Sequence, residues 1–272
     1  MSNRFIWIFL KIELENTMRI AIIGYGKMGK MVEQIARSRG HEIAAIVDPA
    51  AADTPSGIPV YGTIAEAKLD SADAAIEFTQ PALAVANIIA LAEKKIPTVT
   101  GTTGWLERLS EVTQAVEAAN GALLWSSNFS IGVNLFYRIA WYAAELADNF
   151  PEYDIGGFES HHNKKLDSPS GTAKTLAEGV ISRLERKKKI VWETMDRKPE
   201  ADELHFPSLR LGNIPGQHSL FFDSQADTIE ITHTARSREG FASGAVRAAE
   251  WLAEKRHGVF TIDDMLKNIL RI

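Results

Sequence analysis

The stretch RIAIIGYGKMG at residues 19–29 decides the fold. Its first five residues, 19–23, form an apolar run that predicts a buried strand, and its glycines follow the spacing G-x-G-x-x-G. The amphipathic residues 28–39 predict a helix, and the apolar residues 43–47 predict a second strand that ends at Asp48. A strand, a glycine-rich turn, a helix and a second strand in this order indicate the start of a doubly wound α/β domain.

The glycine turn has the chemistry of a dinucleotide-binding loop. Its first glycine permits a tight turn, its second lets a pyrophosphate approach the backbone, and its third lets the helix and strand pack closely. The start of the helix adds amide donors and partial positive charge. The same spacing also occurs in flexible loops, but its placement between a strand and a helix favours dinucleotide binding. The predicted cofactor-binding residues of this loop are Gly24, Tyr25, Gly26, Lys27, Met28 and Gly29.

Asp48 is the residue that bears on the choice of nucleotide. At the end of a strand, its carboxylate can accept hydrogen bonds from both adenosine ribose hydroxyls, and it would repel a 2′-phosphate. Pro49 follows, where a site adapted to NADP often places an arginine. The alternative is a surface aspartate that starts a turn before Pro49. We therefore expect NADH to be used at least as well as NADPH, although Lys27 can contribute some binding of a 2′-phosphate.

The alternation of strands and helices continues along the first half of the chain. Residues 74–78, 98–100 and 122–125 are predicted strands, and residues 82–94 and 107–119 are predicted helices. Open α/β sheets hold their ligands at the carboxyl ends of parallel strands, so the side chains there are expected to meet the nicotinamide half of the cofactor. Taken alone, each of these turns is equally consistent with ordinary turn chemistry. The residues concerned are Phe78, Thr79, Gly101, Thr102, Thr103, Ser126, Ser127, Asn128 and Phe129.

The pattern changes after Asn128. A long helix at residues 131–147 precedes strands that are expected to form an antiparallel or mixed sheet, a single helix among them starts at Thr172, and a final helix spans residues 241–255. The strands are predicted at residues 154–161, 209–211, 219–222 and 228–234. The basic run at residues 186–189 is interpreted as the solvated end of the helix that starts at Thr172. A nucleic-acid patch is the alternative, which the acidic balance of the whole chain disfavours.

The predicted architecture is an α/β fold of two domains. A Rossmann-type, doubly wound parallel sheet comprises residues 18–130 and 240–272, and the final helix returns the chain to it. A smaller α+β domain with a mixed sheet, residues 131–239, is expected to bind substrate and to form oligomer contacts. Residues 1–17 are expected to be a non-native or disordered extension upstream of Met18, with an extra edge strand or a surface anchor as the alternative.

Composition excludes several classes of protein. The chain has 272 residues, of which 45% are hydrophobic and 24% charged, and these are ordinary values for globular domains. Its net charge is -5, which disfavours a nucleic-acid partner. With Cys 0, it can hold neither a disulfide nor a thiolate metal site, which fits a reducing cytoplasm. The apolar stretch near the N-terminus is too short to cross a bilayer, so no membrane association is expected.

The densest chemistry lies at residues 159–173. Two histidines and two lysines stand close together here: His161, His162, Lys164 and Lys165. Directly afterwards Ser170, Gly171 and Thr172 open a helix, and its amides and hydroxyls can receive a carboxylate. Such a cluster of cations favours an anionic ligand. Metal binding is disfavoured because adjacent histidines on a strand point to opposite faces, and a solvated polar loop remains the plain alternative.

The stretch HHNKKLDSPSGTA at residues 161–173 resembles the signature of the dihydrodipicolinate reductase family. The likeness extends over nearly the whole chain from Met18. Besides the glycine turn, it covers residues 77–81, 101–104, 128–134, 210–218, 230–233 and 241–245. The glycine turn is one residue shorter than the form many members show, and Lys27 stands where an arginine is usual. These two departures bear on the choice between NADH and NADPH.

The resemblance implies a reaction and roles for residues. It implies NAD(P)H-dependent reduction of 4-hydroxy-tetrahydrodipicolinate to tetrahydrodipicolinate with loss of water, in lysine and diaminopimelate biosynthesis. It implies that His161 is the proton donor or acceptor and Lys165 the second proton donor. It further implies a small dicarboxylate substrate and a homotetramer assembled through the second-domain sheet, for which the apolar residues 220–222 are suitable. The residues expected to contact the substrate are His162, Ser170, Gly171 and Thr172.

Two other functions remain open from the sequence. Another two-domain amino-acid dehydrogenase, of the aspartate or homoserine type, would share the first domain but would leave residues 161–172 unexplained. A dinucleotide-binding sensor without catalysis would bind NADH tightly but would not turn over. Consumption of NADH with the product of the upstream synthase would separate both from the reductase.

Overall fold

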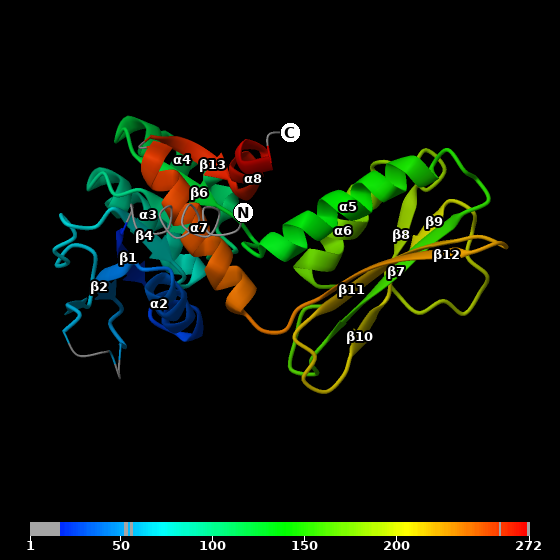
Figure 1. Ribbon diagram of the computed structural model, residues 1–272, viewed down its shortest axis with the longest axis horizontal. Helices are drawn as coiled ribbons and strands as arrows, with labels where there is room; N and C mark the ends of the chain where they lie inside the picture. Colours follow the sequence, from blue (N-terminus) through cyan, green and yellow to red (C-terminus); the bar gives the residue numbers. More distant parts are fainter. Residues whose placement is uncertain (1–16, 52–53, 55–56, 256, 271–272) are drawn as a thin grey trace, which may run out of the picture. The chain divides into compact units, whose positions relative to one another are not determined.

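The apolar run at residues 19–23 forms strand β1 (Arg19–Ile23), in which every side chain after Arg19 is buried. The strand lies inside a seven-stranded sheet of order β13-β6-β5-β4-β1-β2-β3 (Figure 1). All neighbouring strands of this sheet pair in parallel. The computed structural model describes residues 17–51, 54, 57–255 and 257–270. The predicted extension therefore lies almost entirely outside the described residues.

The described chain divides into two compact units. The first runs to Phe129 and resumes at Phe241, and the second is Ser130–Gly240. They are named the nucleotide unit and the substrate unit after the ligands that the sequence predicts for them. Among the described residues, no helix is both long and apolar enough to cross a membrane.

The nucleotide unit has the expected doubly wound, Rossmann-like architecture. Its strands after β1 are β2 (Glu42–Val47), β3 (Val60–Tyr61), β4 (Ala74–Glu77), β5 (Thr98–Thr100), β6 (Ala122–Trp125) and β13 (Gly258–Thr261). Its helices are α2 (Lys27–Ser38), α3 (Pro81–Glu93), the 3-10 turn η1 (Leu106–Arg108), α4 (Leu109–Ala118), α7 (Glu239–Lys255) and α8 (Ile262–Leu270). The run of small and branched apolar residues in β1, β2 and β4 is buried, as expected for a parallel sheet covered on both faces.

Three elements of this unit differ from the sequence prediction. The helix at residues 241–255 is not the last, because α8 follows it. Helix α8 buries Ile262, Met265 and Leu266, which recur at helical spacing, so this signal was present in the sequence. Strands β3 and β13 form the two edges of the sheet with partly exposed side chains, and they carry little apolar pattern.

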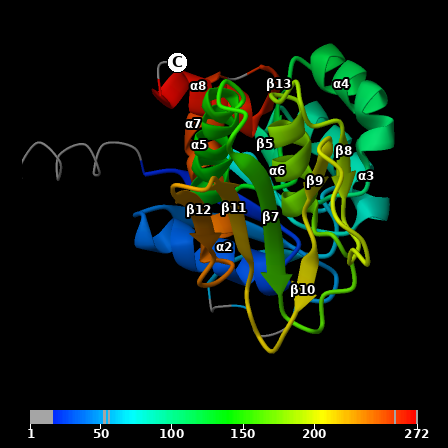
Figure 2. The same cartoon turned by 90° about the vertical axis from the view of Figure 1, so that its right-hand side faces the viewer.

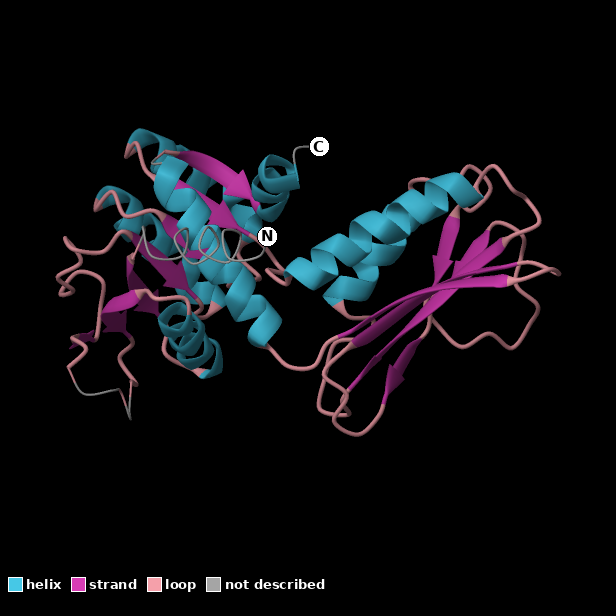
Figure 3. Ribbon diagram, viewed as in Figure 1, coloured by secondary structure: helices cyan, strands magenta, loops and turns pink. Residues whose placement is uncertain are grey.

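The substrate unit is built on a mixed sheet, as predicted. Four strands lie side by side in the order β10-β7-β11-β12, and only the β7–β10 pair is parallel (Figure 2). The strands are β7 (Asp154–His161), β10 (Ser208–Arg210), β11 (Gln217–Asp223) and β12 (Thr228–Thr234), and a separate parallel pair is β8 (Lys189–Val191) and β9 (Glu203–His205). Helices α5 (Ile131–Ala147) and α6 (Gly171–Ile181) lie side by side over this sheet (Figure 3).

The core of the substrate unit corrects the expected role of residues 220–222. Leu220 and Phe222 are buried in the apolar cluster formed with α5 and α6. Phe221 points to the other face of the sheet, where its ring stacks on Phe158 with centroids 6.0 Å apart. Because Leu220 and Phe222 are used inside their own unit, Phe221 is the one residue of the three that is left for the oligomer contact expected of this strand.

The basic run at residues 186–189 is also different from its prediction. Helix α6 ends at Ile181, and the run follows a turn and leads into β8. Lys187 is buried, and its Nζ donates to Asp154 Oδ1 at 2.6 Å and to the Glu203 carbonyl at 2.8 Å. It is therefore a structural cation at the start of β7 and not a solvated helix end. The sequence gives no local sign of partners this distant along the chain.

Candidate active site and nucleotide-binding loop

The glycine loop has two glycines that the fold itself requires. Gly24 has φ +89°, and a Cβ there would lie 2.2 Å from the Phe78 carbonyl oxygen. A Cβ at Gly29 would lie 2.1 Å from the carbonyl oxygen of Gly24. By contrast, a Cβ at Gly26 would meet no described atom within 4 Å. Gly24 and Gly29 thus allow close packing, whereas the space beside Gly26 is open to a ligand.

The start of α2 suits an anion. Gly26 is the N-cap of this helix. Within the described residues, no side chain caps the start of α2, and its first turn contains no acidic residue. The first amides of a helix have no carbonyl partner inside the helix and carry partial positive charge. Together with the open space beside Gly26, this arrangement fits the pyrophosphate of a dinucleotide, which Lys27 and Met28 would flank.

Asp48 ties the end of β2 to the glycine loop. Its Oδ2 accepts from the Tyr25 amide at 2.6 Å, and its Oδ1 accepts from the Ala50 amide at 2.8 Å. The bond from the Ala50 amide is the contact expected of an aspartate that starts a turn, which was the alternative to ribose binding. The hydroxyl of Tyr25 donates to buried Glu33, and burial together with this carboxylate raises the pKa of Tyr25 to about 12. Glu33 is a loop-holding residue that the sequence analysis did not identify.

The ends of β4 and β5 are joined by a buried carboxylate. Glu77 is fully buried and accepts from the hydroxyls of Thr79 and Thr100. The Thr79 amide donates to Thr102 Oγ1 at 2.8 Å. A Cβ at Gly101 would overlap the Phe78 ring, at 2.0 Å from its nearest carbon. The predicted residues at these two strand ends are therefore packed together, and Glu77 is the residue that was missed.

The turn after β6 completes this edge of the sheet. The Ser126 hydroxyl accepts from the Asn128 amide at 3.1 Å and donates to the Asn128 carbonyl at 3.0 Å. The Phe129 ring meets the Phe78 ring edge-on, with centroids 6.4 Å apart. Ser127 and Thr103 are exposed. Ser126 and Asn128 thus form a turn, and Phe129 is the buried anchor of this turn.

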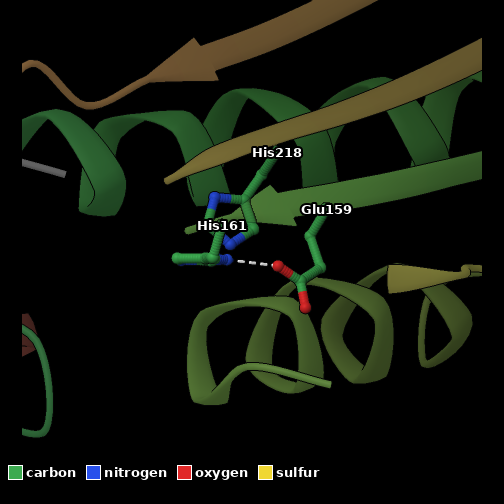
Figure 4. Close-up of side chains that lie close together, drawn as sticks. All are labelled: Glu159, His161 and His218. Atoms are coloured by element: carbon green, nitrogen blue, oxygen red, sulfur yellow. Dashed lines mark hydrogen bonds and ion pairs between the residues drawn. The ribbon is translucent and has the colours of Figure 1, made fainter. Parts of the chain in front are cut away.

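The densest chemistry of the substrate unit lies at the end of β7. Glu159 and His161 are two residues apart on this strand, so their side chains share one face. His161 Nδ1 is hydrogen-bonded to Glu159 Oε2 (Figure 4). The other carboxylate oxygen, Oε1, accepts from Arg210 Nη2 at 2.8 Å and from the Ser170 amide at 3.2 Å. A fully buried carboxylate is therefore surrounded by three donors from different segments.

His218 on β11 is the second imidazole of this cluster. Its ring meets the His161 ring edge-on with centroids 5.3 Å apart, and its Nε2 lies 3.3 Å from the Ser170 hydroxyl. Burial and the neighbouring His161 lower the pKa of His218 to about 3. Burial alone would raise the pKa of Glu159, but the hydrogen bonds from His161 and Arg210 outweigh it and lower that pKa to about 2. At neutral pH Glu159 is therefore ionised and His218 neutral.

The loop after β7 holds the remaining predicted residues. The His162 amide donates to the Ile214 carbonyl at 2.8 Å, which fixes the loop against the segment before β11. Lys165 Nζ lies 2.8 Å from Asp167 Oδ1. Burial tends to raise the pKa of Asp167, but the bond from Lys165 prevails and lowers it. Lys165 is thus held in an ion pair close enough to His218 to contribute to the lowered pKa of that imidazole.

The start of α6 opens beside this cluster. Ser170 is the N-cap, and its hydroxyl accepts from the Ala173 amide at 3.1 Å. A Cβ at Gly171 would meet no described atom within 4 Å, so the space at the first residue of the helix is open. The Thr172 carbonyl accepts from the Tyr137 hydroxyl at 3.3 Å, which anchors the first turn to α5. An open helix start beside a group of cations can bind a carboxylate.

Glu159, His161 and His218 also form a set of three donors whose ligand atoms lie within 4.8 Å of one another, as a metal site requires. Arg210 already lies against Glu159 Oε1, and His161 already occupies Oε2. A guanidinium beside the carboxylate opposes a second cation there, so a hydrogen-bonded network accounts for the set. His218 and Arg210 received no role in the sequence analysis, although both lie in segments that carry the family resemblance.

Comparison with known proteins covers both units. The N-terminal dihydrodipicolinate reductase family matches residues 18–129, and the C-terminal family of the same name matches residues 132–266. The 4-hydroxy-tetrahydrodipicolinate reductase of Christiangramia forsetii is 38% identical over 256 residues, which cover 93% of this chain and 100% of the relative. That of Archaeoglobus fulgidus is 37% identical over 269 residues, covering 92% of this chain and 100% of the relative.

A solved structure shares the fold. The dipicolinate-bound dihydrodipicolinate reductase from Paenisporosarcina sp. TG-14 superposes with a TM-score of 0.74 at 22% identity, over 90% of this chain and 98% of that protein. The agreement extends over both the parallel sheet and the smaller mixed sheet.

Proposed function

This chain belongs to the dihydrodipicolinate reductase family, and from that premise we propose which of its residues carry the reaction. The protein is an NAD(P)H-dependent oxidoreductase of lysine and diaminopimelate biosynthesis, and it reduces 4-hydroxy-tetrahydrodipicolinate to tetrahydrodipicolinate with loss of water. The two alternatives from the sequence, an amino-acid dehydrogenase of the aspartate or homoserine type and a sensor without catalysis, are not favoured, because the similar proteins are 4-hydroxy-tetrahydrodipicolinate reductases.

His161 is the proton donor in this proposal. Bound NAD(P)H supplies the hydride. Its addition to a conjugated imine builds negative charge on the neighbouring carbon or nitrogen, and a nearby acid can neutralise that charge. Nδ1 of His161 is engaged by Glu159, so Nε2 is the nitrogen left to exchange a proton with the substrate. This hydrogen-bonded imidazole, beside an open helix start, is the observation that carries the assignment.

The remaining cations and the helix start hold the substrate's carboxylates. One carboxylate would lie at the open space beside Gly171, where the first turn of α6 offers backbone amides. Thr172 and Ser170 belong to the same turn. Lys165 would exchange its Asp167 partner for the substrate and act as the second proton donor, and His162 would complete the anion site. Donors held in place in this way stabilise charge that develops during the reaction.

NADH is the proposed preferred cofactor. The carboxylate of Asp48 lies next to the glycine loop, held by the Tyr25 amide at 2.6 Å. In this position it would accept bonds from the ribose hydroxyls of NADH and oppose the 2′-phosphate of NADPH.

The exposed face of α5 and the edge strand β12 are the proposed assembly surface of a homotetramer. Leu146, Phe150 and Ile229 are 50%, 53% and 51% exposed. They line a cavity of about 420 Å³ beside the sheet edge. An edge strand next to exposed apolar side chains favours pairing with another copy.

Analytical sedimentation tests this surface. Ile229→Asp should dissociate the assembly, whereas Leu83→Asp, which changes an exposed leucine of α3, should not. A monomeric wild-type protein would contradict the assignment.

Loss of NADH absorbance tests the function as a whole. Purified protein is mixed with NADH and the freshly formed product of the upstream synthase, and the rate is compared with that for aspartate and homoserine as substrates. We expect NADH to be oxidised with the synthase product and not with aspartate or homoserine. Turnover of aspartate or homoserine without turnover of the synthase product would contradict the assignment.

A further inference from the structure

We propose that Glu159 is the positioning residue of the active site: its carboxylate, fixed by Arg210 and the Ser170 amide, holds His161 as the tautomer with a proton on Nδ1. In that tautomer Nε2 is the atom that exchanges a proton with the substrate. The inference rests on the proposed role of His161 and adds to it a residue that contacts neither substrate nor cofactor in the proposed reaction.

The carboxylate is held from two sides. Oε1 accepts from two groups that can only donate, the Arg210 guanidinium at 2.8 Å and the Ser170 amide at 3.2 Å. Parallel pairing of β10 with β7 brings Arg210 level with His161, which explains why the guanidinium reaches this face. Oε2 is then left for His161 Nδ1. An ionised carboxylate accepts only, so the proton of this bond belongs to the imidazole.

The opposite edge of the His161 ring packs against the backbone of a glycine. A Cβ at Gly216 would lie 2.9 Å from His161 Nε2 and 3.3 Å from Cδ2. Gly216 has φ +147°, a conformation that side chains with a Cβ rarely adopt. The two ring nitrogens therefore have different surroundings: a fixed carboxylate at Nδ1, and a backbone without a side chain at Nε2. This asymmetry is what a fixed tautomer requires.

His218 adds a second constraint on the ring. It meets His161 edge-on and lies 3.3 Å from the Ser170 hydroxyl. Burial and the proximity of His161 lower its pKa to about 3, so it remains neutral and does not compete with His161 for the charge of Glu159. The other titratable and charged groups that bear on the cluster are Arg210, which is paired with Glu159, Lys165, which is paired with Asp167, and His233 on the neighbouring strand β12.

Glu159→Gln provides a sharp test because the two oxygens of the carboxylate have different partners. Arg210 and the Ser170 amide both require an acceptor, so the amide oxygen of the new side chain must take the Oε1 position. Its NH2 group then faces His161 Nδ1 and makes this nitrogen an acceptor, which moves the proton to Nε2. A wrong tautomer of a catalytic histidine costs roughly 10⁴-fold in kcat in a related arrangement.

The experiment combines kinetics with 15N NMR of the histidine rings in the full-length protein. For Glu159→Gln we expect kcat to fall by roughly 10³–10⁴-fold with a small change in KM, and the neutral His161 to carry its proton on Nε2. Glu159→Asp, which keeps the charge, should retain part of the activity and the Nδ1 proton. The control is Glu203→Gln, which weakens the ion pair of another buried glutamate of the same unit with the half-exposed Arg197 and should leave kcat and the tautomer unchanged.

Two results would overturn the proposal. One is a wild-type protein whose neutral His161 carries the proton on Nε2, which can be measured even if the variants do not fold. The other is a folded Glu159→Gln protein with kcat within tenfold of that of Glu203→Gln. Failure of the proposed function is distinguishable, because in that case wild type would not oxidise NADH with the synthase product, whereas the tautomer could still be read.

Discussion

The two units form their sites in different ways. In the nucleotide unit, the glycine loop offers the backbone of one continuous segment, and a Cβ at Gly24 or Gly29 would collide with carbonyl oxygens. In the substrate unit, the site consists of charged and polar side chains that β7, β10, β11 and the start of α6 bring together around Glu159. The first site depends on local shape, and the second depends on buried charge and on the register of distant strands.

This difference predicts how each site fails. A backbone site tolerates no added atom at its tight positions. A side-chain site can lose one group while its fold persists, but the loss leaves other buried polar groups without partners. We therefore expect the largest effects on turnover in the substrate unit and the smallest at a single charge beside the glycine loop.

Removing the side chain of His161 or Lys165 should abolish most turnover without changing the affinity for NADH. We expect His161→Ala to lower kcat by about 10³-fold with little change in KM, because a general acid acts mainly in the transition state. Lys165→Ala should impair both parameters, because it also binds the diacid. NADH affinity, measured by fluorescence titration, should stay at the wild-type value in both. His205→Ala, on β9 of the same unit, is the control, and wild-type turnover in His161→Ala would remove that residue from the site.

An added methyl group should separate two glycines of the nucleotide unit. Gly24→Ala should destabilise the protein by about 3 kcal/mol, because it combines an unfavourable positive φ with a collision against the Phe78 carbonyl. Gly26→Ala should leave the melting temperature near that of wild type but weaken NADH binding, since the space beside it is open. Thermal unfolding and NADH titration of both variants measure the contrast. Equal melting temperatures for the two variants would contradict the assigned roles.

The same contrast explains what could be predicted from the sequence. The glycine spacing, the apolar runs of β1 and β2 and the polar residues after β5 are local patterns, and they predicted the parallel sheet and the position of its loop. The mixed sheet followed from strand-length runs such as residues 228–234. Strand β13 could not be predicted with the same ease, because its four residues are partly exposed and show little apolar pattern.

The candidate active site was only partly predictable for the same reason. His161 and Lys165 stand in a short, distinctive stretch, and the family resemblance gave them roles. The partners of Glu159 could not be inferred from spacing, because Arg210 reaches it through the register of β10 against β7 and His218 lies on another strand. Lys187 shows the same limit, since its partner Asp154 lies far back along the chain.

Mild acid should weaken the substrate unit through His218. In the folded protein the pKa of His218 is lowered to about 3 from 6.5, so the unfolded chain takes up a proton that the folded chain refuses. Stability should therefore fall as the pH drops from 6.5 toward 3, by about 2 kcal/mol between pH 6.5 and pH 5. Hydrogen exchange of β7 and β11 amides measures this, with β1 amides as the reference.

His218→Gln should remove this share of the acid sensitivity, because the new side chain does not titrate. An unchanged slope of stability against pH in that variant would show that other groups are responsible. Glu159 acts in the same direction at lower pH: its pKa is lowered to about 2, so its contribution is present above its usual pKa of 4.5 and is lost as the pH falls toward 2.

The smallest effect should come from Asp48, whose side chain places a single negative charge beside the backbone of the glycine loop. Asp48→Asn removes the charge but keeps an oxygen that can accept from the Tyr25 amide. Without repulsion of a 2′-phosphate, kcat/KM for NADPH relative to NADH should rise about tenfold, which corresponds to about 1.4 kcal/mol. Asp73→Asn, on an aspartate that accepts from the Arg19 amide at 2.7 Å, should leave the ratio unchanged. A wild-type enzyme that strongly prefers NADPH would instead mean that Lys27 or another cation outweighs Asp48, and that side-chain charge governs the nucleotide unit as well.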